Sequence, residues 1–184
     1  TLQQDANLYL NMSGSRAMAV AQSLYEGIEI DGELTGLITY MRTDSLRIAD
    51  DALFEANAFL KETYGSENVH RRQYKSKKSA QDAHEAIRPT SIHIRPDDIK
   101  SKLTTDQYKL YKLIWERFAA SQMESAEYRI TTAEIDAKGH TFRATGSEIT
   151  FKGYMSVYVE SADTKEEKTK ALPKLSDKEE VLLQ

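Results

Sequence analysis

The chain has 184 residues, 40% of them hydrophobic, which is enough for one large domain or two small ones with a substantial buried core. It has no cysteine, which excludes disulfides and thiolate metal sites, and no apolar run approaches the roughly 18 residues of a membrane span. Its net charge of -4 argues against a protein that coats nucleic acid nonspecifically, because such binding depends on clustered positive charge. Any contact with DNA must therefore be local.

The first predicted elements are a helix, which Ser13 caps and Gly27 ends, and a hairpin. The helix spans residues 16–26, and the residues at three- and four-residue spacing along it are Met18, Ala21, Gln22 and Tyr25. Strands at 28–30 and 34–41 flank a short turn. A helix followed by such a hairpin is typical of winged-helix domains.

The second strand leads Tyr40 into the polar sequence Met-Arg-Thr-Asp-Ser. A phenol is a poor nucleophile at neutral pH unless a cation stabilises its phenolate or a base takes its proton. Arg42 is two residues away, and in extended backbone it points to the same side as Tyr40. A guanidinium that binds two phosphate oxygens beside a phenol suits attack on a phosphodiester. Alternatively, Tyr40 is a buried residue at a strand end beside a surface arginine.

A second helix is predicted from Asp50 to the residue before Gly65. Its core-facing residues are Leu53, Ala56, Phe59 and Leu60. Negative side chains favour the positive end of the helix dipole, so we interpret the pair Asp50 and Asp51 as a helix start rather than a metal site. The pair Asp97 and Asp98 also precedes a helical pattern.

The most basic stretch of the chain runs from residue 70 to residue 78 and surrounds Tyr74. Its cations are Arg71, Arg72, Lys75, Lys77 and Lys78. They can hold backbone phosphates while the tyrosine stacks on a base. The same composition also fits a solvated loop without a DNA contact.

A third helix is predicted over residues 79–87, and the following proline ends it. His84 and Arg88 are four residues apart, so they would emerge on one face near the C-terminus of this helix. Two such donors can grip a phosphate. Alternatively, His84 packs against the helix end while Arg88 pairs with Glu85 or Asp82.

A capping box from Thr104 to Gln107 opens the longest predicted helix, which extends to Met123. Its buried stripe consists of Leu110, Tyr111, Ile114, Trp115 and Phe118. The charged side chains Lys109, Lys112, Glu116 and Arg117 would stay exposed. We interpret this helix as scaffold, because aromatic residues at such spacing usually form core.

After residue 124 the pattern changes to alternation, which predicts strands. The predicted features are a strand around 128–133, turns at 138–139 and at Gly146, a strand over 151–159, a charged mobile loop over 161–170 and a short strand over 181–183. The chain thus divides into a mainly helical part, residues 1–123, and a β-rich part, residues 124–184. This organisation is of the α+β class.

The stretch from Ile38 to Ser45 resembles the active-site tyrosine motif of the type IA DNA topoisomerases, the family of bacterial DNA topoisomerase I. Thr-Leu-Gln-Gln at residues 1–4 and Ala-His-Glu-Ala-Ile-Arg-Pro at residues 83–89 match that family in order and approximate spacing. The agreement continues through Leu-Tyr-Lys-Leu-Ile-Trp at residues 110–115. Because the first residue lies inside a matching stretch, we expect the chain to be a piece of a longer protein.

The resemblance implies that Tyr40 attacks one DNA strand and becomes linked to its 5′ phosphate. Another strand then passes through the break, and the free 3′ hydroxyl reverses the reaction without ATP. Arg42 would stabilise the phosphoryl transition state, and His84 would bind the phosphates of the cleaved strand. Thr43, Asp44, Ser45 and Arg88 would support the site or contact DNA.

The resemblance also implies that residues 1–123 form a winged-helix-like domain carrying the tyrosine. Residues 124–184 would form an incomplete antiparallel part of an arch domain, with exposed strand edges. The family needs Mg²⁺, held by acidic residues of a Toprim domain, and the chain has no Asp-x-Asp-x-Glu sequence. We therefore expect the Mg²⁺ ligands to lie outside this chain, and the chain alone to be inactive.

The partners implied are single-stranded or negatively supercoiled DNA and, in the same polypeptide, the Toprim domain and the rest of the arch. The implied location is the cytoplasm, at the nucleoid and without a membrane.

Two alternative functions belong to other classes of protein. A non-catalytic winged-helix module would explain the helices and the basic stretch. A tyrosine recombinase also joins DNA to a tyrosine, but in that family the tyrosine follows the arginine and histidine, whereas Tyr40 precedes His84 and Arg88.

Overall fold

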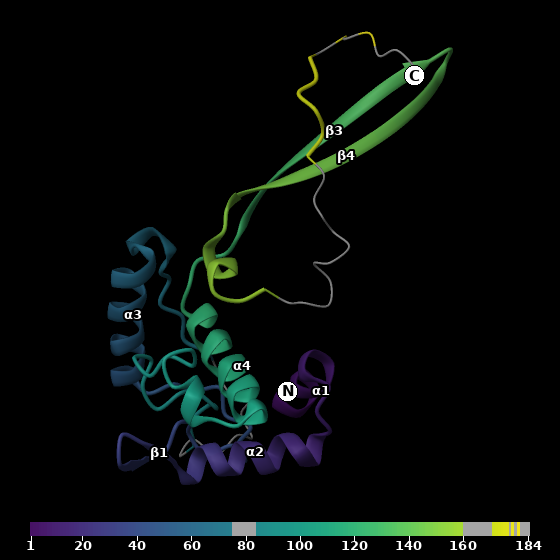
Figure 1. Cartoon of the computed structure of the whole chain (residues 1–184). Helices are drawn as coiled ribbons and strands as arrows, with labels where there is room; N and C mark the ends of the chain where they lie inside the picture. The colour runs from purple at the N-terminus through teal and green to yellow at the C-terminus, as the bar shows by residue number, and fades with distance from the viewer. Residues whose placement is uncertain (75–83, 160–170, 177, 179, 181–184) are drawn as a thin grey trace.

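The computed structural model describes residues 1–74, 84–159, 171–176, 178 and 180. In this part of the chain, helices form a body from which a long β-hairpin extends (Figure 1). The helices are α1 (Leu2–Leu10), α2 (Gly14–Glu26), α3 (Asp50–Tyr64) and α4 (Thr105–Ser121), with short 3-10 helices η1 (Ser66–Asn68), η2 (Lys100–Lys102) and η3 (Gly153–Ser156). The strands form two antiparallel pairs, β1 (Ile28–Ile30) with β2 (Glu33–Thr35), and β3 (Glu127–Ala137) with β4 (His140–Phe151). The mixed architecture confirms the predicted α+β class.

Helix α2 forms where the sequence predicts it, but it buries a different face. The Ser13 hydroxyl accepts a hydrogen bond from the Arg16 N–H, and Gly27 ends the helix with φ 123°. The buried residues are Ala17, Ala21 and Leu24. Tyr25, which the spacing put on the predicted face, is 42% exposed. Helix α2 packs against α4.

Helix α4 supplies much of the core, and its predicted capping box and buried stripe are both confirmed. The Trp115 indole N–H donates to the carbonyl of Ile92 (2.9 Å), and the Tyr111 hydroxyl donates to that of Ile94 (2.7 Å). These bonds fasten the loop after residue 90 to the helix. Burial of Tyr111 also raises the pKa of its phenol.

Helix α3 is also confirmed, with Asp50 and Asp51 in its first turn.

No α-helix follows Asp97 and Asp98, so the helix predicted there is wrong. The chain forms turns and η2 before α4 begins. The Asp97 carboxylate instead accepts a hydrogen bond from the Tyr108 hydroxyl (2.6 Å), which lowers the pKa of Asp97. Helix α1 was not predicted, and Ala6 is its one fully buried residue. No helix in the described ranges is long and apolar enough to cross a bilayer.

The β3–β4 hairpin turns at Lys138 and Gly139, as predicted, with positive φ at both residues. The predicted turn at Gly146 is wrong, since this glycine pairs with Thr131 inside the ladder. The predicted strand over 151–159 is wrong as well. Gly153 takes φ 49°, and a side chain there would lie 2.4 Å from a carbonyl oxygen at Glu124, so the chain bends into η3.

Apart from these elements, three predictions cannot be compared with the structure. The loop over 161–170 and the strand over 181–183 lie outside the described residues, as does most of the basic stretch after Tyr74. The division of the chain at residue 123 stays a prediction.

Candidate active site

Two segments far apart in sequence meet beside α2: the Tyr40 segment (residues 36–45) and the His84 segment (residues 84–90). They run antiparallel, with an isolated β-bridge between them. The Thr39 N–H donates to the carbonyl of Arg88 (2.9 Å). The predicted strand over 34–41 is therefore two pieces, because β2 ends at Thr35 and the chain then pairs with a different partner.

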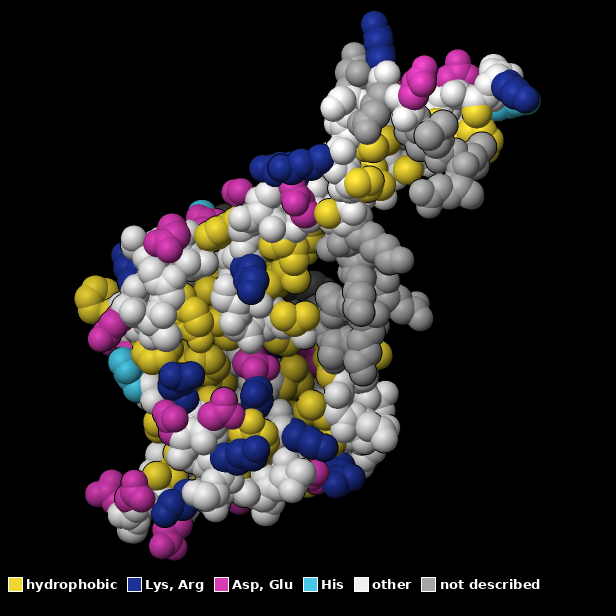
Figure 2. Space-filling view, turned by 45° about the horizontal axis from the view of Figure 1, so that its top comes forward, with side chains coloured by type: hydrophobic (Ala, Val, Ile, Leu, Met, Phe, Trp, Pro, Cys, Tyr) yellow, Lys and Arg dark blue, Asp and Glu magenta, His cyan; other side chains and the backbone are white. Residues whose placement is uncertain are grey.

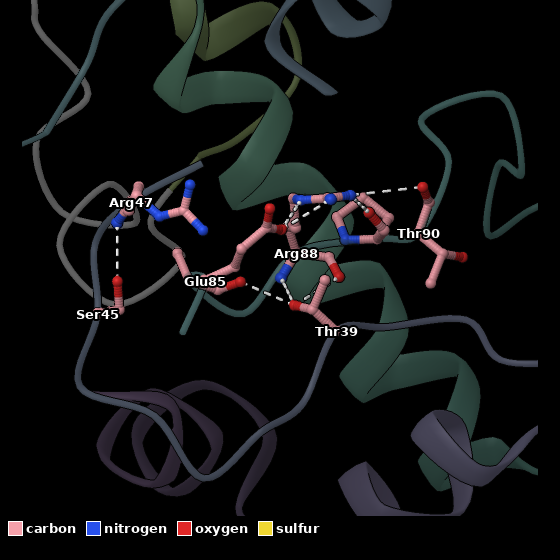
Figure 3. A network of polar contacts seen from close by, with 8 residues as sticks. Thr39, Ser45, Arg47, Glu85, Arg88 and Thr90 are labelled. Atoms are coloured by element: carbon pink, nitrogen blue, oxygen red, sulfur yellow. Dashed lines mark hydrogen bonds and ion pairs between the residues drawn. The ribbon is translucent and has the colours of Figure 1, made fainter. Parts of the chain in front are cut away.

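The side chain of Thr39 strengthens this pairing (Figure 3). Its hydroxyl donates to the carbonyl of Ala86 (2.7 Å) and accepts from the Arg88 N–H (2.9 Å). The Ala86 N–H donates to the carbonyl of Arg47 (2.7 Å). These backbone groups bond across the chain rather than to residues four positions earlier. For this reason residues 84–88 are not helical, and the helix predicted over 79–87 is wrong there, while residues 75–83 lie outside the described ranges.

The pairing brings the His84 ring near Tyr40, with ring centroids 6.4 Å apart. Tyr25 of α2 approaches Tyr40 more closely, with centroids 5.4 Å apart and the planes at 66°. Tyr40 is 42% exposed, so it is not a buried residue at a strand end. Its phenol is open to solvent and to a ligand.

Arg42 is exposed and has no ion pair or side-chain hydrogen bond within the described part of the chain. Together with Tyr40 it lines an open hollow of about 540 Å³, which we call the Tyr40 hollow. The other described residues of its wall are Ser15, Met18, Ala19 and Gln22, all from α2. Phenol and guanidinium therefore share one accessible concave surface, although the backbone bends at residues 41 and 42 and is not extended as the spacing prediction assumed.

The next residues of the segment face elsewhere. The Ser45 N–H donates to the Thr43 hydroxyl (3.0 Å), and the Arg47 N–H donates to the Ser45 hydroxyl (3.2 Å), which forms a tight turn. Thr43, Asp44 and Ser45 line a second hollow of about 610 Å³ next to α1 and α4, which Arg88 also borders. Tyr40 thus shares a hollow with Arg42 and lies near His84, whereas the four predicted supporting residues line a different hollow.

Arg88 forms an ion pair within its own segment (Figure 3). Its Nε and one terminal nitrogen lie 2.9 and 2.7 Å from a Glu85 carboxylate oxygen, and the other terminal nitrogen donates to the carbonyl of Pro89 (2.9 Å). The side chains of Arg88 and Glu85 are only 13% and 21% exposed. The pairing with Glu85 that the sequence left open is present, although without the helix. A DNA contact by Arg88 stays a prediction, and it would compete with these bonds.

We expect Arg88→Ala to lower the free energy of unfolding by about 2–3 kcal/mol, because it leaves a largely buried carboxylate without its charged partner. Urea unfolding measures this loss. The double variant Arg88→Ala with Glu85→Gln should recover part of the stability. Unchanged stability together with weaker DNA binding would instead show that Arg88 acts on DNA.

The start of the basic stretch is held by acidic residues. Arg71 pairs with Asp50 (2.8 Å), and Arg72 lies 3.8 Å from Glu124. His70 bonds to the same Glu124 carboxylate (2.9 Å), which lowers the pKa of Glu124. Lys75, Lys77 and Lys78 lie outside the described residues. On the face shown in Figure 2, cations and acidic side chains are interspersed over the helical body and do not form a continuous basic surface.

Gly36 sets the distance between the Tyr40 segment and α2. A Cβ at this position would lie 2.9 Å from the carbonyl oxygen of Tyr25, and the next residue, Leu37, donates its N–H to the carbonyl of Leu24 (2.8 Å). The segment can follow the end of α2 this closely because residue 36 has no side chain.

We expect Gly36→Ala to lower stability by about 1–3 kcal/mol and to reduce any activity that depends on Tyr40, because backbone must move to make room. Thermal unfolding measures the first effect. Gly14→Ala is the matched control: its Cβ meets only the flexible Gln3 side chain, at 3.3 Å, and it begins a helix. Equal effects of the two changes would contradict this role of Gly36.

The described residues do not offer a site for Mg²⁺. They contain no group of three or more histidine, cysteine, aspartate or glutamate side chains arranged to hold a metal ion. The Glu85 carboxylate, next to His84, pairs with Arg88.

Sequence reasoning missed the contribution of α2 to this site. Tyr25 and the four residues of α2 in the wall of the hollow come from a helix to which the sequence analysis assigned no part in the site. The residues at three- and four-residue spacing in α2 indicated that one face is buried but not which residues the Tyr40 segment would contact. That contact depends on the backbone bond between Leu37 and Leu24, which no local pattern shows.

A family model of DNA topoisomerases matches the chain over residues 1–184, and the chain belongs to this family. The full-length topoisomerase I of Thermotoga maritima is a similar solved structure, with 42% sequence identity and a TM-score of 0.73. The similarity covers 85% of this chain and 25% of that protein, so the chain spans about a quarter of its relative. These findings confirm the resemblance to bacterial type IA topoisomerases.

Proposed function

We propose that this chain is the tyrosine-bearing part of an ATP-independent type IA topoisomerase that relaxes negatively supercoiled DNA by cutting and resealing one strand. The observation that carries the proposal is the exposed phenol of Tyr40 in one hollow with Arg42 and near His84, in a member of the DNA topoisomerase family. The family membership sets aside the tyrosine-recombinase alternative.

In the proposed reaction, the phenolic oxygen of Tyr40 attacks the phosphorus of a single-stranded segment. The bond from phosphorus to the 3′ oxygen breaks, and a 5′-phosphotyrosine link and a free 3′ hydroxyl form. The phenol loses a proton and the leaving oxygen gains one. Because one phosphodiester replaces another, the step is close to isoenergetic and reverses when the 3′ hydroxyl attacks the link.

Arg42 and His84 stabilise the charge that this exchange moves. The exposed guanidinium of Arg42 is available to bind phosphoryl oxygens at the Tyr40 hollow, where negative charge grows in the transition state. His84 donates a hydrogen bond to a neighbouring phosphate oxygen. Thr43, Asp44 and Ser45 support the turn after the nucleophile, and the basic stretch with Arg71, Arg72, Lys75, Lys77 and Lys78 contacts the DNA backbone.

The remaining parts of the reaction belong to other domains of the same polypeptide in this proposal. A Toprim domain holds Mg²⁺ and supplies the proton for the leaving oxygen, and further strands complete the arch to which β3 and β4 belong. The protein acts on single-stranded or negatively supercoiled DNA, in the cytoplasm at the nucleoid.

The experiment is to compare the isolated chain with the full-length protein on a single-stranded oligonucleotide labelled at its 3′ end. With Mg²⁺, the full-length protein should retain the label covalently and release a fragment with a free 3′ hydroxyl, whereas the isolated chain should cleave nothing. Label retained only from the 5′ end would reverse the proposed polarity. Metal-dependent cleavage by the isolated chain would contradict its dependence on the Toprim domain. A non-catalytic winged-helix module would bind the oligonucleotide and form no covalent product in either case.

A further inference from the structure

The Tyr40 hollow extends beyond the reacting groups, across a face of α2 that the reaction itself does not use. Its volume of about 540 Å³ falls within the range of about 300–1,000 Å³ that is usual for ligand sites in proteins. A bare phosphate group would fill only part of it. The hollow therefore has room for a further group of the ligand next to the phosphate.

Helix α2, which forms the floor of the hollow, is anchored in the protein core. The opposite face of α2 consists of fully buried residues, Ala17, Ala21 and Leu24, within the main core. The bond from the Leu37 N–H to the carbonyl of Leu24 fixes the Tyr40 segment against the same helix. The position of α2 relative to Tyr40 is thus set by the fold, and a ligand needs little rearrangement to bind there.

The hollow combines charged, apolar and hydrogen-bonding groups. Arg42 supplies a positive charge with no partner in the described residues, which suits one phosphate. Met18 and Ala19 offer apolar surface, which suits the face of a nucleobase. Gln22 donates to the Glu26 carboxylate (2.6 Å), which leaves its amide oxygen able to accept from a base edge. The negative charge of Glu26 disfavours a second phosphate beside Gln22.

We propose that the Tyr40 hollow binds the nucleotide directly after the break, the one whose 5′ phosphate Tyr40 carries, with its base against Met18 and Ala19. This inference rests on the proposed function and names a binding site for its substrate. The contact holds the broken 5′ end noncovalently, in addition to the covalent link to Tyr40. It also makes the amount of cleavage depend on the base that follows the break.

The test uses the full-length protein and two single-stranded oligonucleotides, one normal and one with an abasic nucleotide directly after the break. For the wild-type protein, we expect the abasic oligonucleotide to give about fivefold to tenfold less covalent adduct, since stacking on a protein surface favours a base over none. Ala19→Leu fills the hollow from an exposed position and should bring the ratio between the two oligonucleotides close to one.

Ala58→Leu is the matched control, because it makes the same change at an exposed position of α3, and it should keep the wild-type ratio. If Ala19→Leu does not fold, Ser15→Leu at the other exposed position of the hollow replaces it. A wild-type ratio near one, or an unchanged ratio in the filled variant, would overturn the inference while adduct formation at Tyr40 continues. Covalent adduct formation that does not require Tyr40 would overturn the proposed function instead.

Discussion

Replacing Tyr40 with phenylalanine is expected to reduce covalent adduct formation of the full-length protein by at least about four orders of magnitude, because no other group replaces a lost nucleophile efficiently. Noncovalent binding of single-stranded DNA should stay within about twofold, since the ring and its contacts with Tyr25 and His84 remain. Trapping of labelled oligonucleotide on denaturing gels measures the adduct, and fluorescence anisotropy measures binding.

The stringent control for this variant is Tyr25→Phe. Tyr25 and Tyr40 are both 42% exposed and their rings are in contact, so exposure alone does not identify the nucleophile. Only Tyr40 of the two shares the hollow with Arg42. Tyr25→Phe keeps the ring and should change adduct formation less than about threefold. The opposite result, with adduct lost in Tyr25→Phe and kept in Tyr40→Phe, would move the nucleophile to α2.

Removing the guanidinium of Arg42 should have the second largest effect. We expect Arg42→Ala to slow single-turnover adduct formation by about a thousandfold, which corresponds to roughly 4 kcal/mol of transition-state stabilisation. Arg42→Lys should recover part of the rate, because an ammonium supplies charge without the bidentate geometry. Quenched-flow kinetics at saturating oligonucleotide separates this effect from weaker binding.

Arg47→Ala is the matched control for Arg42. Arg47 follows in the same stretch and is exposed, but it does not line the Tyr40 hollow. Its removal should change the rate less than about threefold. A similar slowing in both variants would show that overall positive charge, rather than a guanidinium placed beside the phenol, assists the reaction.

The predictions from sequence succeeded where local chemistry decides the structure. Caps and apolar periodicity placed α2, α3 and α4. Glycine also marked ends correctly, as at Gly27 and at the Lys138–Gly139 turn. In each case the signal comes from residues that are neighbours along the chain.

The predictions failed where distant segments compete for the same backbone groups. The N–H and carbonyl groups of residues 86–90 bond to the Tyr40 segment, so a sequence with helical spacing is extended instead. Gly153 bends the chain against the carbonyl of Glu124 for a similar reason. His84 nevertheless reaches Tyr40, but by antiparallel pairing and not on a helix face, and only a tertiary structure could show that route.

The most direct test of the account is to map the covalent adduct. The full-length protein is trapped on a short oligonucleotide, digested and analysed by tandem mass spectrometry. A glutamate-specific protease separates the two neighbouring tyrosines, because Glu26, Glu29 and Glu33 lie between them. The account predicts a nucleotide linked through its 5′ phosphate to Tyr40, and a nucleotide found on Tyr25, or on no tyrosine at all, would contradict it.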